Sequence, residues 1–200
     1  TMHHLIPRDE KGRSNYRMGA LRPNQFGVGD DGVREYVESV SKASGEFLQI
    51  VNYTLAGPQY AVAGTIAGLK ALKADSARRV AEYGGKPAFM LVPGIDVPFH
   101  STLLRKGVPE FRDKLDALLP KHIDYRGRLV GRYIPNLVDV PFELTKEFAA
   151  KLLEVVPSER IKAALDDPKL WDTYAEADQQ LVRLPRTDLL SWQFASPGRW

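Results

Sequence analysis

One histidine in this 200-residue chain stands in a setting suited to acid–base chemistry. His100 follows Pro98 and Phe99 and precedes Ser101, between an apolar run at 88–92 and an amphipathic segment at 103–119. Pro98 fixes its own φ and keeps Val97 out of the helical region, so we expect a defined loop. An imidazole has an unperturbed pKa of about 6.5, and it can therefore accept and return a proton near neutral pH. His100 is the candidate catalytic residue, although spacing alone also allows an idle loop histidine.

The sequence offers no obvious nucleophile or metal site for such a histidine to act on. The sequence contains no Gly-x-Ser-x-Gly nucleophile elbow. Ser101 is adjacent, but we expect its hydroxyl to cap the helix that follows. His3 and His4 stand together, yet a metal site would need further ligands, so no metal site is predicted.

Composition excludes several classes of protein. The apolar fraction of 44% is ordinary for a folded chain. The net charge is only +3, without a long Lys/Arg block, and this argues against nucleic acid as a partner. There are no cysteines, hence no disulfides and no thiolate chemistry. No apolar stretch approaches the ~20 residues of a transmembrane helix, so no membrane span is predicted.

The elements before the loop follow a recognisable order. Strands are predicted at 16–21, 47–53, 60–63 and 88–92, from their β-branched and aromatic residues and flanking turn signals. Helices are predicted from Asp30 or Asp31 to Gly45 and from Thr65 to Gly84, from apolar residues at i, i+3, i+4 and i+7. The resulting β-α-β-β-α-β order is that of a ferredoxin-like α/β subdomain, which by itself indicates no particular function.

The second half of the sequence is mostly helical in pattern. Helical periodicity covers 103–119, a short strand is predicted at 129–134, and further helices begin near Thr145 and Ser158. The acidic, polar stretch at 166–180 is expected to run over the surface, before an apolar helical patch at 189–194.

Several short segments, taken together and in this order, resemble the malonyl/palmitoyl transferase domain of fungal- and actinobacterial-type multifunctional (type I) fatty acid synthases. The resemblance covers nearly the whole chain. It rests on the segments at 6–10, 12–16, 50–53, 59–64, 94–101, 133–137, 141–147 and 192–197. In such transferases a ferredoxin-like subdomain is inserted into an α/β-hydrolase-like lobe. The resemblance therefore implies an entry segment at 1–15, a ferredoxin-like subdomain at 16–93, and the C-terminal part of the acyltransferase lobe at 94–200.

The family's chemistry is ping-pong acyl transfer, and the resemblance assigns residues to it. A serine attacks an acyl-CoA thioester and passes the acyl group to acyl carrier protein, while the histidine matched by His100 moves the serine proton. Phe99 matches the residue beside the acyl α-carbon and implies a preference for malonyl over methylmalonyl groups. Asn52 and Gln59 match polar substrate-binding positions, although backbone hydrogen bonding at strand ends is an equal alternative. The serine and the malonyl-binding arginine would lie upstream of Thr1, so the chain is expected to be an incomplete transferase.

The same resemblance implies the molecular context. The partners would be CoA thioesters, acyl carrier protein with its phosphopantetheine, and the rest of a large, homo-oligomeric cytoplasmic synthase, including the serine-bearing lobe. No cofactor is expected in this segment, and NADPH and FMN would be bound by other domains of the parent. The alternative is a non-catalytic structural or interaction segment of the same multienzyme.

Overall fold

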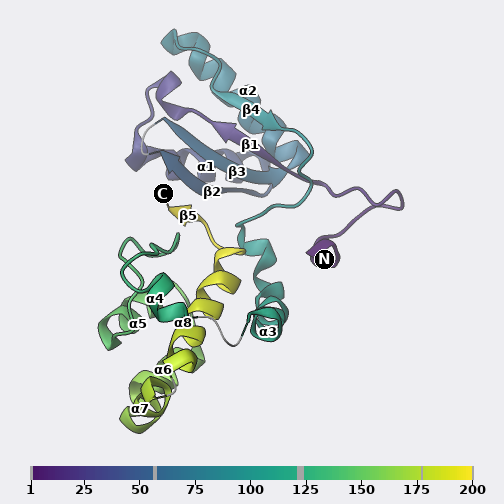
Figure 1. Cartoon of the computed structure of the whole chain (residues 1–200). Coiled ribbons are helices and arrows are strands. Elements are labelled where there is room, and N and C mark those ends of the chain that lie inside the picture. The colour runs from purple at the N-terminus through teal and green to yellow at the C-terminus, as the bar shows by residue number, and fades with distance from the viewer. Residues whose placement is uncertain (1, 56–57, 121–123, 177, 200) are drawn as a thin grey trace. The chain divides into compact units, whose positions relative to one another are not determined.

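The computed structural model describes residues 2–55, 58–120, 124–176 and 178–199, which form two compact units (Figure 1). The first unit comprises residues 1–106 together with 195–200, and the second comprises residues 107–194. The loop that carries His100 thus belongs to the first unit. The predicted assignment of residues 94–200 to a larger acyltransferase lobe concerns a longer protein and stays a prediction.

The first unit is built on one sheet with two helices. In chain order its main elements are β1 (Tyr16–Leu21), α1 (Asp30–Ser44), β2 (Leu48–Leu55), β3 (Gln59–Thr65), α2 (Ile66–Tyr83) and β4 (Phe89–Val92). The strand order is β4-β1-β3-β2-β5, where β5 (Gly198–Arg199) lies parallel to β2 and the other neighbours are antiparallel. The prediction of a ferredoxin-like βαββαβ subdomain within a mixed α/β chain is confirmed.

Local sequence explains the two helices. In α1 the residues at i, i+3, i+4 and i+7 from Val33 are buried, and the helix ends at Gly45, whose φ of 68° suits a residue without a Cβ. Helix α2 begins after Thr65, whose hydroxyl accepts a hydrogen bond from the Gly68 N–H at 3.0 Å. Three short 3-10 helices, at Met2–Leu5, Pro23–Phe26 and Thr102–Gly107, complete the described elements of this unit.

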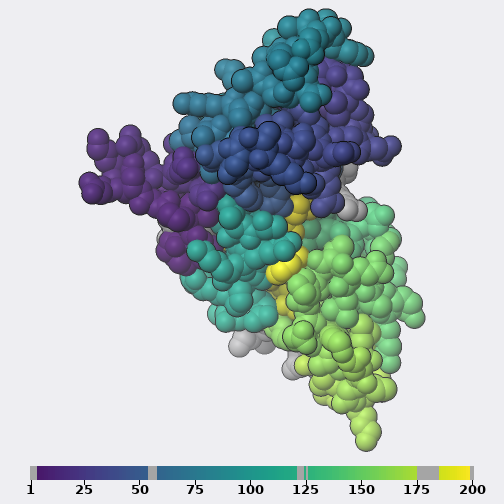
Figure 2. Space-filling view, turned by 180° about the vertical axis from the view of Figure 1, so that it is seen from behind, coloured from purple at the N-terminus to yellow at the C-terminus, as the bar shows by residue number. Residues whose placement is uncertain are grey.

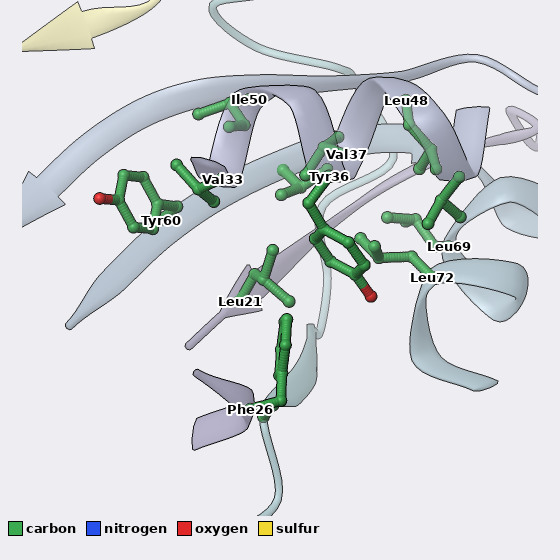
Figure 3. Packing of buried hydrophobic residues seen from close by; sticks show 13 residues of the cluster. Leu21, Phe26, Val33, Tyr36, Val37, Leu48, Ile50, Tyr60, Leu69 and Leu72 are labelled. Atoms are coloured by element: carbon green, nitrogen blue, oxygen red, sulfur yellow. The ribbon is translucent and has the colours of Figure 1, made fainter. Parts of the chain in front are cut away.

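The two faces of the sheet differ. Both helices pack on one face, where a continuous core joins side chains from α1, α2 and the strands (Figure 3). It includes Leu21, Val33, Tyr36, Leu48, Tyr60 and Leu72. The opposite face, called here the open face, carries a smaller cluster of Met18, Val51 and Ala63. Ile95, from the loop after β4, packs against that cluster.

The second unit is helical. Its helices are α3 (Val108–Leu118), α4 (Tyr125–Leu129), α5 (Lys146–Leu153), α6 (Glu159–Asp166), α7 (Pro168–Glu176) and α8 (Asp178–Gln193). Their core centres on Phe142, which is fully buried and stacks edge-on against Phe148 at 5.2 Å between ring centroids. Helices α5 and α6 begin where predicted: the hydroxyls of Thr145 and Ser158 accept the N–H groups of Phe148 and Ile161.

A buried carboxylate stabilises this unit. Asp188 is 3% exposed and accepts a hydrogen bond from the hydroxyl of Ser158. Arg160 donates Nη2–H to Asp188 at 2.5 Å and Nη1–H to the more exposed Asp116 at 3.0 Å. The charge of Asp188 is thus compensated by an adjacent cation and by a hydroxyl donor, which buried charges require.

One local prediction was wrong, and the structure refines two others. Residues 129–134 form no strand, because Asp124 accepts the Gly127 N–H and starts helix α4, which ends at Leu129. The polar stretch after 166 lies at the surface, as predicted, with residues 166–169, Asp172 and Thr173 exposed. It forms helix α7, whose partly buried Leu170, Trp171 and Tyr174 pack onto the core of the second unit. The predicted helix at 103–119 is divided into a 3-10 segment and α3, which begins at Val108.

The described part of the chain was also compared with the requirements of a membrane-spanning helix and of a metal site. None of its helices is long and apolar enough to cross a lipid bilayer. Within the same residues, no three His, Cys, Asp or Glu side chains gather in a way that could hold a metal ion.

Candidate active site

The loop at 93–101 gives His100 an unusual backbone conformation. The Phe99 N–H donates to Val97 O at 2.9 Å, and the Ser101 N–H donates to Pro98 O at 3.3 Å. Within these tight turns His100 has a φ of +60°, and it is the sole non-glycine residue of the described chain with a positive φ. A side chain in this region costs about 1–2 kcal/mol relative to ordinary backbone. Such strain persists only where surrounding contacts impose it, and it concentrates at functional sites.

Contacts with the open face of the sheet impose this conformation from both ends of the loop. Before His100, Ile95 packs against the cluster of Met18, Val51 and Ala63, and Val97 is 5% exposed. After His100, both the N–H and the hydroxyl of Thr102 donate to Gln49 Oε1 on β2, each at 3.0 Å. The loop therefore leaves the edge strand β4, crosses the open face and is fastened to β2.

An ion pair supplies a third support. Arg8 donates two hydrogen bonds to the carboxylate of Asp96, from Nη1 at 2.5 Å and from Nη2 at 3.2 Å. The hydrogen bond to Asp96 raises the pKa of Arg8 further above its ordinary value, with the charge of Asp96 adding to the effect. Nη1 of Arg8 also donates to Gly12 O at 2.7 Å, so the N-terminal segment is held against the loop. Figure 2 shows this segment, in purple, projecting from the side of its unit.

The four residues predicted for the site lie on two structural features. His100 is partly buried and Phe99 is 39% exposed, a high value for a phenylalanine, so its ring is accessible from solvent. Asn52 and Gln59 lie on β2 and β3. Ala61 lies on the open face. The register pairs Asn52 with Ala61, and Gln59 lies two residues before Ala61 on the same strand, so the side chains of Asn52 and Gln59 also lie on the open face, which the loop crosses.

The two amide side chains have different surroundings. Oε1 of Gln59 accepts a hydrogen bond from Arg22 Nε at 3.3 Å, at the end of β1. Oδ1 of Asn52 is buried and has no hydrogen-bond partner among the described residues. A buried acceptor without a donor costs about 1–3 kcal/mol. Asn52 therefore has an unused acceptor on the face where the loop lies.

The hydroxyl of Ser101 makes a different hydrogen bond from the predicted one. Its side chain is fully buried, and its hydroxyl donates to Pro98 O at 2.7 Å rather than accepting an N–H of the following helix. The expectation that this hydroxyl caps the helix was wrong, because the turn at Pro98 brings a carbonyl within its reach. A hydroxyl buried in this way is also unsuited to act as a nucleophile.

Sequence reasoning missed two supporting residues, Gln49 and Arg8. Gln49 is a polar residue within the apolar run 47–53, and this break in the pattern was the available signal. Arg8 lies in a polar segment that resembles any solvated connection, and its partner is 88 residues away. Nothing local to residue 8 indicates that contact.

Comparison with solved structures defines the class of fold. No family model matches the chain. The acyl-carrier-protein S-malonyltransferase of Burkholderia pseudomallei 1710b matches all of this chain and 45% of its own, with a TM-score of 0.54 and 22% identity. A malonyl-transacylase solved in complex with its type II PKS acyl-carrier protein matches all of this chain and 44% of its own, with a TM-score of 0.51 and 15% identity. The chain thus has the fold of part of an acyltransferase.

Sequence relatives narrow this class. The fatty acid synthase subunit beta of Saccharomyces cerevisiae is 32% identical over 88% of this chain, and fatty acid synthase 2 of Mycosarcoma maydis is 34% identical over all of it. The chain is related to one segment of these proteins and resembles the malonyl/palmitoyl transferase part of such synthases, which confirms the resemblance stated from the sequence. It spans 10% of the yeast subunit's length and 6% of the Mycosarcoma protein's.

Proposed function

We propose that this chain is the histidine-bearing part of an acyltransferase, which moves malonyl and long-chain acyl groups between CoA and acyl carrier protein in a type I fatty acid synthase. The observation that carries the proposal is that the Mycosarcoma synthase and the solved malonyltransferases each align with the whole chain. The strained, well-supported His100 loop adds to it, because a general base must be held in one geometry.

His100 has the role of proton carrier in this proposal. A serine from a part of the larger polypeptide outside this chain attacks the thioester carbon, and His100 takes the hydroxyl proton as the Ser–acyl bond forms. The CoA sulfur then leaves and receives that proton. In the second half-reaction His100 takes the proton of the phosphopantetheine thiol, the sulfur attacks the ester, and the serine oxygen regains a proton.

Phe99 and the two amides are assigned to substrate selection. The half-exposed ring of Phe99, next to the base, occupies the space that an α-methyl group of the acyl substrate would need. Asn52 has an acceptor available to a donor on the substrate or on the serine-bearing lobe. Gln59 has its carbonyl engaged by Arg22, so its amide N–H groups are the part assigned to substrate.

The remaining context is part of the same proposal. The partners are CoA thioesters, acyl carrier protein and the serine-bearing lobe of a large, homo-oligomeric cytoplasmic synthase. The transacylase solved with its acyl-carrier protein supports the carrier as a partner. Acyl transfer between thioesters requires no redox group, so no cofactor is assigned to these residues.

The decisive test is His100→Ala in the complete synthase. Removal of a general base lowers the rate of malonyl loading onto acyl carrier protein by about 10²–10⁴. His4→Ala, which removes an exposed histidine distant in sequence from the loop, is the matched control and should load normally. Normal assembly of both variants, checked by analytical ultracentrifugation, separates catalysis from folding. Unchanged loading by His100→Ala would favour the non-catalytic, structural alternative.

A second test examines the isolated chain. Its intact mass after incubation with malonyl-CoA should be unchanged, because Ser101 is buried and its hydroxyl is engaged by Pro98 O. A stable malonyl adduct would place the nucleophile within these 200 residues and contradict the division of the site between two segments.

A further inference from the structure

Strand β4 leaves one side of the sheet without a neighbour. It lies at the end of the strand order and pairs only with β1. The Arg22 N–H donates to Ala88 O at 2.7 Å, so the backbone groups of Ala88, and by alternation those of Met90, point towards β1. The N–H and C=O groups of Phe89 and Leu91 therefore point away from the sheet. The structure gives them no backbone partner among the residues it describes.

Strand β4 is short and lies between Pro87 and Pro93, but its own side chains carry no charge that would oppose pairing. Exposed edge strands are normally shielded by charged residues, by bulges or by a covering segment. Residues 87–95 contain no charged side chain. Met90 is 62% exposed and Leu91 is 50% exposed, on opposite faces of the strand. An apolar, uncharged edge of this kind is one to which another strand can add.

A hollow lies beside β4 on each face. On the helix side a hollow of about 270 Å³ is walled by apolar side chains of α2 and β4: Ile66, Leu69, Phe89 and Leu91. On the other side a hollow of about 290 Å³ is lined by apolar residues, including Ala20, Pro87 and Met90, and by a single cation, Arg22. Successive side chains of an added strand would enter the two hollows alternately.

The charges around the helix-side hollow specify the added strand further. Arg17, Lys70 and Lys73 line it, and no carboxylate does. Nη1 of Arg17 is held by the carbonyls of Ser14 and Tyr16 at 2.8 and 2.6 Å, which fixes this cation at the edge. Further along α2, in contrast, Arg78 and Arg79 both bind Asp75. The hollow thus presents three cations without acidic neighbours in its wall.

We propose that β4 is a docking edge for an extended segment of another polypeptide, which adds to the sheet as a strand and carries acidic residues on the helix side and apolar residues on the other. This inference is independent of the acyl-transfer proposal, because it uses none of the residues assigned to catalysis. A second copy of this chain is disfavoured as the occupant. Two β4 strands paired about a two-fold axis would bring six cations, three from each copy, to the same face of the joined sheet.

The test uses a fluorescein-labelled nine-residue peptide in which valine and glutamate alternate, with binding to the 200-residue chain followed by fluorescence anisotropy. We expect saturable binding that weakens as salt is raised. The same peptide with lysine in place of glutamate should not bind. A version N-methylated at alternate residues, which cannot donate to Leu91 O, should also fail. Equal binding of the N-methylated peptide would overturn strand addition.

Protein variants locate the site. Lys73→Glu, at an exposed position, should weaken peptide binding by about fivefold at low salt. Lys42→Glu makes the same charge change at an exposed position on α1 and should leave affinity unchanged. Leu91→Pro removes the outward N–H and should abolish binding while β4 remains paired with β1, which circular dichroism checks. Equal effects of the two lysine variants, or a dimer in solution that Leu91→Pro disperses, would contradict the proposed occupant.

Discussion

Because His100 has a positive φ, we predict that the protein is more stable with glycine at this position than with alanine. Alanine retains the Cβ atom that clashes with the backbone when φ is +60°, whereas glycine adopts this region freely. His100→Gly and His100→Ala both remove the imidazole. The difference between their unfolding free energies therefore isolates the backbone conformation of the loop from any contact of the histidine ring.

The expected magnitude follows from two opposing effects. Relief of the left-handed strain favours glycine by about 1–2 kcal/mol. The greater freedom of glycine in the unfolded chain opposes this by about 0.5–1 kcal/mol. We therefore expect His100→Gly to be more stable than His100→Ala by about 0.5–1 kcal/mol. At Ala77, an exposed interior position of α2, glycine should instead be less stable than alanine by about 0.5–1 kcal/mol.

The assay is urea unfolding of the four proteins, followed by circular dichroism, with the slopes compared to establish that each variant exposes the same surface. Glycine should be more stable than alanine at position 100 and less stable than alanine at position 77. If His100→Ala is as stable as His100→Gly or more stable, while Ala77→Gly is destabilised as expected, the loop does not hold a left-handed residue and the reasoning is refuted. In the complete synthase both His100 variants should lack malonyl loading, because a relaxed backbone does not restore the base.

Three further predictions concern stability. Asp188→Asn should lower the free energy of unfolding by about 2–3 kcal/mol, because it weakens charged hydrogen bonds in a buried site. Asp116→Asn, at the less buried end of the same arginine, should lower it by under about 1 kcal/mol. Chemical denaturation of the two variants compares them. Burial disfavours the charge of Asp75, but hydrogen bonds from Arg78 and Arg79 outweigh it and hold its pKa below the ordinary value. The stability lost in Asp75→Asn should therefore be largest above about pH 5 and shrink as the pH falls below about 4, which unfolding curves at several pH values measure. Phe142→Ala should cost about 3–5 kcal/mol in thermal or urea unfolding, because the ring is fully buried.

The first unit was predictable because its elements are defined by local patterns. The apolar spacing from Val33, Gly45 at the end of α1 and Thr65 at the start of α2 each act within one or two helical turns. The order of strands and helices then leaves few arrangements for the four predicted strands, whereas the two-residue fifth strand, β5, was not predicted. The same reasoning failed at 129–134, where the apolar residues suggested a strand but the cap at Asp124 started a helix.

The geometry of the site was less predictable, because it depends on contacts between distant segments. Pro98 indicated a stiff loop, and the loop is indeed tightly turned. The contacts of Thr102 with Gln49 and of Arg8 with Asp96 join residues 53 and 88 positions apart. The break that Gln49 makes in the apolar run at 47–53 signals a polar role but does not identify Thr102 as its partner. Nothing beside Arg8 indicates its contact, and a histidine gives no local reason for a left-handed backbone.

These long-range contacts also explain how the loop tolerates its strain. A histidine at positive φ would relax to ordinary backbone if either end of the loop were free to turn. Ile95 and Asp96 restrain the segment before His100, through the open face and through Arg8, and Thr102 restrains the segment after it through β2. Asn52 shares the same strand as Gln49, so the sheet that holds the loop also presents the candidate polar group beside it. The ferredoxin-like subdomain thus serves as the rigid support on which the orientation of the candidate base depends.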